Sequence, residues 1–198
     1  MEFPAPRTLC SLLAPAILVI GGCGSAPREP APITYASSET ANAASATGSD
    51  DDTAERRFPG IRFQVPTYWQ DQPKSQFYDS KFVIPSEHGE MTLTMTTMGG
   101  GIDGNFARWQ GQFQLDSAER PRRETLSVDG ITSHWIDVRG TYSSSVGSDL
   151  GPHPDWRLLG VAIPIRPKLF LMKLIGPQQA VADFHEEFRR FVRSAGTD

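Results

Sequence analysis

The sequence predicts an α+β fold, in which a mostly antiparallel sheet is sandwiched by two amphipathic helices after a signal peptide and a disordered tether. Several segments alternate apolar and polar residues with the period of a half-buried strand. Two other segments repeat apolar residues at the spacing of one helix face. All four tryptophans and ten of the eleven phenylalanines follow residue 57, so we expect a single folded domain over 58–198.

The first 22 residues resemble the signal peptide of a bacterial lipoprotein. The apolar run over 9–20 is shorter than the roughly 20 residues that a membrane-spanning helix needs. It ends in Ile-Gly-Gly before Cys23, which resembles the lipobox of that family. The resemblance implies cleavage before Cys23 and attachment to a membrane through acyl chains, such as palmitate, on this residue. Gly24 stands where Asp would, and by resemblance to the sorted lipoproteins of two-membrane bacteria this implies the periplasmic face of the outer membrane and not the inner membrane. The alternative is an ordinary signal peptide with an incidental cysteine.

Residues 23–57 are expected to form a disordered tether after the lipidated cysteine. Of the 34 residues from Gly24 to Arg57, 22 are Ala, Ser, Thr, Pro or Gly. Such a segment buries too little apolar surface to offset the entropy lost on ordering. As a flexible coil it would reach roughly 30–35 Å from the anchor.

The first half of the domain contains three expected strands and one helix. The first expected strand, over 61–65, alternates apolar and polar residues and ends at Pro66. The second covers 77–84 and ends before a proline. The third, over 91–96, alternates Met or Leu with Thr. After a glycine-rich turn, Asn105 is the expected N-cap of the helix. The apolar residues at i, i+3 and i+7 on this helix are Phe106, Trp109 and Phe113.

The second half is expected to hold four strands and the clearest helix. Residues 125–128 and 131–142 flank Asp129-Gly130, a strong signal for a two-residue hairpin turn. Residues 156–163 and 169–175 form the next two strands. A helix then opens near Pro177, because proline is tolerated in a first turn. Its apolar stripe consists of Val181, Phe184, Phe188, Phe191 and Val192.

The domain resembles the PsbP/Mog1/DcrB-like superfamily over 58–198. The residues that carry the resemblance are Phe63, Val65, Pro66 and Trp69, then Arg108, Trp109, Gln112 and Phe113, and finally Lys173, Leu174, Gly176, Pro177, Val181, Phe188, Phe191, Val192 and Ser194. The superfamily has an antiparallel sheet between helices and includes photosystem extrinsic subunits, a small-GTPase partner and bacterial envelope lipoproteins. The resemblance implies an accessory or binding protein and identifies no ligand.

Composition excludes several classes of protein. The formal net charge of −4 argues against a nucleic-acid binder. The two cysteines both lie near the N-terminus, which excludes a multi-disulfide scaffold and a structural Cys/His zinc site.

A glycine-rich turn and a group of arginines are the candidate binding surface. The turn spells G-x-G-x-x-G over 99–104, a pattern that can hold a pyrophosphate. Antiparallel neighbours and the charge of Asp103 argue against a nucleotide, so we expect a mobile loop and no bound cofactor. The arginines could meet an anionic headgroup or an acidic partner, or form a solvated basic loop. The candidate residues are Gly99, Gly100, Gly101, Asp103, Gly104, Arg120, Arg122 and Arg123.

No catalytic motif is complete. The four histidines lack the spacing of a helical zinc pair, and G-x-S-x-G does not occur. We therefore expect no catalytic residues, no metal and no enzyme activity. The main hypothesis is a lipid-anchored, non-catalytic module that binds an envelope protein or a small ligand. One alternative is a hydrolase that joins His134, His153 or Ser145 to a carboxylate. The other is an assembly or chaperone factor with an apolar groove beside the glycine-rich loop.

Overall fold

The computed structural model describes residues 52–115, 119–143 and 151–197. The predicted signal peptide, Cys23 and all but the last residues of the predicted tether lie outside these ranges. No helix within the described ranges is long and apolar enough to cross a membrane.

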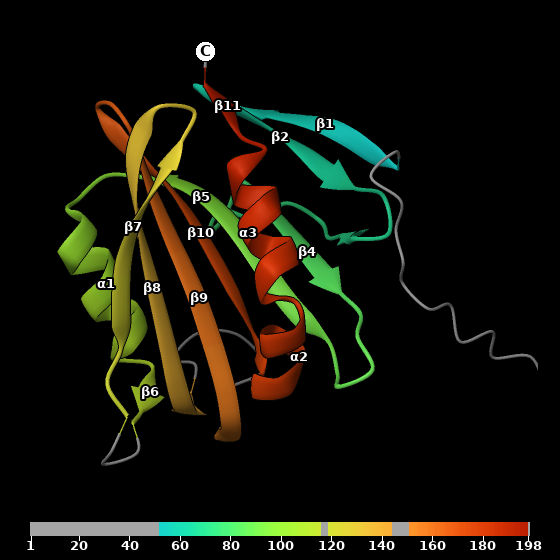
Figure 1. Cartoon of the computed structure of the whole chain (residues 1–198), viewed down its shortest axis with the longest axis vertical. Coiled ribbons are helices and arrows are strands. Elements are labelled where there is room, and N and C mark those ends of the chain that lie inside the picture. Colours follow the sequence, from blue (N-terminus) through green and yellow to red (C-terminus); the bar gives the residue numbers. More distant parts are fainter. Residues whose placement is uncertain (1–51, 116–118, 144–150, 198) are drawn as a thin grey trace, which may run out of the picture. The chain divides into compact units, whose positions relative to one another are not determined.

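The described residues form two antiparallel sheets and three short helices (Figure 1). The larger sheet has the strand order β3-β4-β5-β10-β9-β8-β6, with β7 also paired to β8, and the smaller sheet has the order β1-β2-β11. The predicted α+β class with a mostly antiparallel sheet is therefore confirmed. The bounds in chain order are β1 Thr53–Phe58, β2 Ile61–Pro66, β3 Gln70–Asp71, β4 Ser80–Ile84, β5 Met91–Met98, α1 Ile102–Gln110, β6 Phe113–Gln114, β7 Arg122–Val128, β8 Ile131–Tyr142, β9 His153–Ile165, β10 Lys168–Pro177, α2 Gln178–Asp183, α3 His185–Arg193 and β11 Gly196–Thr197.

One face of the larger sheet, here called the α3 face, holds the larger core. Each central strand contributes apolar residues to it, among them Phe82, Leu93, Met172, Leu159 and Trp135. Helices α2 and α3 and strand β2 cover this face, as Figure 1 shows for the two helices. The ring of Phe188 lies 5.4 Å from that of Trp135, and the ring of Phe191 lies 5.1 Å from that of Phe63.

The opposite face, here called the α1 face, has a smaller core under α1. Its apolar residues come from β8, β9 and β10, and they pack against Phe106, Trp109 and Phe113. Farther along the same face, β5 presents the threonines that alternate with Met91, Leu93 and Met95, and these threonines are only partly buried. Helix α1 is nine residues long, so it covers only part of this face.

The hairpin at Asp129-Gly130 is confirmed. Asp129 has φ 46° and Gly130 has φ 78°, the positive values that a two-residue turn between twisted strands requires. Strands β7 and β8 pair directly across it, with Val128 opposite Ile131.

Strand β1 lies in the last residues of the predicted tether. It pairs with β2 along its whole length, from Thr53 opposite Pro66 to Phe58 opposite Ile61. The strand is almost entirely exposed and has no apolar alternation, so the hydrophobic pattern could not reveal it. The strands of the described domain therefore begin at Thr53, before residue 58.

Three helix details differ from the expectation. Gly101 is the N-cap of α1, because the helix starts at Ile102 and Asn105 lies inside its first turns. Phe113 lies beyond the helix in β6, although it joins the same core. The last helix is divided into α2 and α3 at Phe184, whose ring packs 5.9 Å from that of Trp69.

Candidate functional site

The structure brings the two halves of the predicted binding surface together. The carboxylate of Asp103, in the first turn of α1, lies 2.7 Å from the guanidinium of Arg123 on β7. The Arg123 guanidinium also lies over the ring of Phe106, 5.5 Å from its centroid. Arg122 begins β7, so this residue and Arg123 belong to a strand and not to a loop. Because Asp103 already pairs with Arg123, the surface offers less positive charge than the sequence suggests.

A groove on the α1 face contains none of these candidate residues in its lining, and no sequence motif indicated it as a site. It is open to solvent and has a volume of about 380 Å³. Its floor is formed by the partly buried threonines and Met98 of β5 with Leu171 and Lys173 of β10. The end of α1 and the residues after it form one wall, and Phe77, whose side chain is 65% exposed, forms the other. The lining thus combines apolar surface with two cationic side chains, Arg108 and Lys173.

The strand register explains why the groove begins at Lys173. Thr94 on β5 lies opposite Lys81 on one side and opposite Lys173 on the other. Lys173 in turn lies opposite Gly160 on β9. A Cβ atom at Gly160 would come within 2.4 Å of the Trp109 ring, so the missing side chain lets α1 rest on the sheet there. Helix α1 therefore packs over Gly160, next to Lys173. The sheet at Thr94 on β5, on the other side of Lys173, is not covered by the helix.

Lys173 is a largely buried amine with no carboxylate partner among the described residues. Its Nζ donates to Oε1 of Gln112 at 3.1 Å and lies 5.6 Å from the centroid of the Tyr142 ring. Burial, followed by the positive charge of Arg108, lowers the pKa of Lys173 to about 8. A minor neutral fraction, about a tenth of the amine, is therefore present at pH 7. An anion in the groove would favour the charged form.

Arg108 supplies the second cation of the groove. Its Nη2 donates to Oδ1 of Asn105 at 3.1 Å and contacts Sδ of Met98 at 3.7 Å. The amide of Asn105 also donates to the carbonyl of Gly101, which ties the arginine to the start of α1. Within the described ranges no carboxylate lies within ion-pair distance of Arg108. The groove therefore presents two positive charges that no described acidic side chain neutralises.

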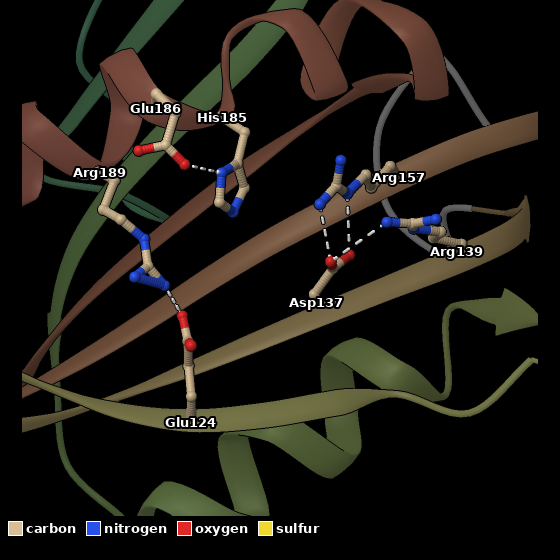
Figure 2. A network of polar contacts seen from close by, with 7 residues as sticks. All are labelled: Glu124, Asp137, Arg139, Arg157, His185, Glu186 and Arg189. Atoms are coloured by element: carbon tan, nitrogen blue, oxygen red, sulfur yellow. Dashed lines mark hydrogen bonds and ion pairs between the residues drawn. The ribbon is translucent and has the colours of Figure 1, made fainter.

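On the α3 face, the charged groups are already paired (Figure 2). Asp137 on β8 accepts two hydrogen bonds from Arg157 on β9, at 2.9 and 2.7 Å, and lies 3.7 Å from Arg139. The guanidinium of Arg189 on α3 pairs with Glu124 on β7. These contacts join neighbouring strands and fasten α3, which is a structural role.

The same face holds two further polar contacts of α3. Nδ1 of His185 lies 2.9 Å from the carboxylate of Glu186 (Figure 2). The hydroxyl of Tyr68 donates to Glu187, and burial together with this hydrogen bond raises the pKa of Tyr68.

The histidines proposed for the hydrolase alternative do not share a site. His134 lies opposite Ala162 at one end of the β8–β9 ladder, whereas His153 lies opposite Tyr142 at its other end. The ring of His153 stacks on Trp156 at 4.4 Å. Ser145 lies outside the described residues. Among those that the structure does describe, no group of three or more His, Cys, Asp or Glu could hold a metal ion.

No family model matches the chain, and no curated protein sequence matches it. Solved structures similar to the chain include the solution structure of cyanobacterial PsbP (CyanoP) from Synechocystis sp. PCC 6803. That alignment has 15% identity and a TM-score of 0.49, and it covers 76% of this chain and 96% of the other. A protein of unknown function from Pseudomonas aeruginosa, PA94, is also similar, with 15% identity, a TM-score of 0.42, and 72% and 94% coverage. The first of these is a PsbP protein, the family that the sequence motifs resemble.

Proposed function

We propose that this protein is a lipid-anchored cell-envelope protein whose domain is a non-catalytic binding module for a small organic anion. Cys23 supplies the anchor, and the α1-face groove binds the ligand. The PsbP-like arrangement of helices on both faces of an antiparallel sheet fits the accessory role that the sequence resemblance implies.

The observation that carries the proposal is the pair of cations in the groove. Lys173 and Arg108 face a space of about 380 Å³ that is also lined by Trp109, Leu171 and Met98. A carboxylate or similar group would form charge-assisted hydrogen bonds with the cations, each of which contributes about 1.5–3 kcal/mol. The apolar part of the lining suits an aromatic or aliphatic body on the same ligand.

This ligand class also separates the proposal from the assembly-factor alternative. An assembly or chaperone factor would need a groove suited to exposed apolar segments of client proteins. The two cations disfavour a purely apolar segment, because its binding would bury them without a partner. The groove therefore favours an anionic ligand over an apolar client.

Calorimetric titration of the full-length protein with 4-(hydroxymethyl)benzoate tests the groove. The neutral analogue 4-(hydroxymethyl)benzamide has nearly the same shape and should bind at least about tenfold more weakly, since 1.4 kcal/mol is a factor of ten. Arg108→Gln should also weaken the binding of 4-(hydroxymethyl)benzoate by about tenfold. Lys168→Gln, which removes an exposed lysine at the start of β10, should leave the affinity for 4-(hydroxymethyl)benzoate unchanged. Equal affinities for benzoate and benzamide would contradict the proposal.

Membrane fractionation with intact mass measurement tests the anchor. With Cys23→Ser, we expect the protein to remain an uncleaved precursor or to be released as soluble protein, without an acyl mass increment. A variant still cleaved before residue 23 and membrane-bound with an unmodified N-terminus would disprove the lipoprotein assignment.

A further inference from the structure

Lys173 differs from the other lysines of the chain in its surroundings. The sequence contains four lysines, and the other three are Lys74, Lys81 and Lys168. Lys74 and Lys168 are exposed, and Lys81 is partly exposed at the outer end of the row that it forms with Thr94 and Lys173. Lys173 alone lines the α1-face groove. Its amine is therefore the one that meets any ligand bound there.

The surroundings of Lys173 favour a nucleophilic amine, because burial and the positive charge of Arg108 both disfavour its charged form. The side chain is positioned in the groove by contacts with Gln112 and the Tyr142 ring. The pKa of about 8 leaves a neutral fraction that carries a free lone pair. A neutral amine that donates to the Gln112 amide oxygen keeps this lone pair for attack on a carbonyl carbon.

We infer that Lys173 reversibly captures an aldehyde or ketone group of the bound organic anion as an imine. This inference rests on the groove binding proposed above and adds the chemical class of ligand, an anionic carbonyl compound. Nζ forms a bond to the carbonyl carbon, and the carbonyl oxygen leaves as water with both hydrogens of the amine. The imine nitrogen then takes a proton from solvent, so no oxidant or reductant is needed.

The second cation of the groove decides which carbonyl compounds are captured. Arg108 lines the groove next to Met98 and is available to pair with the anionic group of the ligand. A ligand held by Arg108 keeps its carbonyl group close to Nζ, which raises the effective concentration for the reaction. Capture should therefore be faster for an anionic aldehyde than for a neutral one.

Borohydride trapping with 4-formylbenzoate tests the inference on the full-length protein. The imine is reduced to a stable secondary amine, and peptide mapping by mass spectrometry locates it. We expect the peptide with Lys173 to carry the adduct at least tenfold more often than peptides with Lys74, Lys81 or Lys168. Benzaldehyde, which lacks the carboxylate, should label Lys173 several-fold less. Labelling of the four lysines in proportion to their exposure would overturn the inference.

Two matched variants separate the chemistry from the charge. Lys173→Arg keeps the positive charge and should abolish labelling of this segment, while Lys81→Arg, on the same sheet face, should leave the Lys173 adduct unchanged. Arg108→Gln should lower the Lys173 adduct several-fold. Mapping in the wild-type protein decides the matter even if Lys173→Arg does not fold.

Binding of 4-(hydroxymethyl)benzoate, which cannot form an imine, is measured in parallel. If this alcohol binds and 4-formylbenzoate leaves Lys173 unlabelled, the imine inference fails and the groove proposal stands. If the alcohol does not bind and Lys173 is still labelled selectively, the reactive lysine stands and the proposed groove binding fails.

Discussion

The α3 face and the α1 face of the larger sheet use their polar residues in opposite ways. On the α3 face, two helices and strand β2 cover the sheet, and its buried charges, such as Asp137 and Arg157, bind each other. On the α1 face a single nine-residue helix covers part of the sheet, and Lys173 and Arg108 have no described acidic partner. Paired charges support a fold, whereas unpaired ones beside an open groove are available to a ligand. We therefore expect the α3 face to contribute mainly to stability, and we propose the α1 face for ligand binding.

The largest expected effect is loss of folding when a charge enters the α3-face core. Phe188 is fully buried against Trp135 and Phe191. Phe188→Asp would bury an unpaired carboxylate and remove the aromatic packing. We therefore expect the free energy of unfolding to fall by more than about 4 kcal/mol and the cooperative melt to be lost. The control is Phe77→Asp at the exposed edge of the α1-face groove, which should fold with a near-wild-type melt by circular dichroism. A cooperative, near-wild-type melt for Phe188→Asp would contradict the assignment of the α3 face as the main core.

The strongly patterned parts of this comparison could be predicted from the sequence. The stripe containing Phe188 and the Met/Leu–Thr alternation of β5 identified core positions, because a buried helix face and a half-buried strand leave clear periodicities. Strand β1 was missed because an exposed edge strand is fixed by pairing with β2 and not by apolar burial. The groove was missed for a similar reason, since it depends on cross-strand register. Arg108, Gln112 and Lys173 appeared in the family-like motif only as part of a packing pattern, and nothing in their spacing indicates that they meet.

A second effect tests the charge pair on the α3 face. Arg157 is 6% exposed and gives both of its hydrogen bonds to Asp137. Asp137→Ala would leave a buried guanidinium without its partner, which should cost about 3–5 kcal/mol in chemical denaturation. Replacing both residues, as in Asp137→Leu with Arg157→Met, should recover most of this loss.

The matched control breaks the exposed pair beside the α1 face. The Asp103 side chain is 91% exposed, so Asp103→Ala removes its ion pair with Arg123 at a cost of less than about 1 kcal/mol. If Asp103→Ala and Asp137→Ala lower the free energy of unfolding by the same amount, the two faces do not differ in how their charged pairs contribute to stability.

A third effect concerns the packing of α1 on the sheet. The Trp109 ring occupies the space above Gly160, so Gly160→Ala forces the helix and the sheet apart. We expect overpacking to lower the free energy of unfolding by about 2–3 kcal/mol. Binding of 4-(hydroxymethyl)benzoate should also become weaker, because Arg108 moves with the helix. Gly99→Ala is the control, since no atom lies within 4 Å of a Cβ atom at that position. Denaturation and calorimetry on the two variants measure both effects. Unchanged affinity for 4-(hydroxymethyl)benzoate in Gly160→Ala would contradict the proposed role of α1 in ligand binding.

The smallest effect is a pH-dependent difference in stability from Lys173. The pKa of this lysine is about 8 in the folded protein, against an ordinary value of 10.5, so between these limits the unfolded chain binds more protons. Stability must therefore rise with pH across this window. Below pH 8 both states are protonated and the folded protein carries the full cost of burying the charge, which disappears above 10.5. Lys173→Met has no such cost at any pH.

We therefore expect wild type to gain about 1–2 kcal/mol relative to Lys173→Met between pH 7.5 and pH 10.5, after allowance for the partial solvent exposure of the amine. Urea denaturation of both proteins at the two pH values gives this difference directly, since the other titrating groups are common to both. Lys168→Met, at an exposed position at the start of β10, is the control and should differ from wild type by the same amount at both pH values. Parallel pH profiles for wild type and Lys173→Met would show that the amine is as well solvated as an ordinary lysine. The α1 face would then lose the unusual amine that distinguishes it from the α3 face.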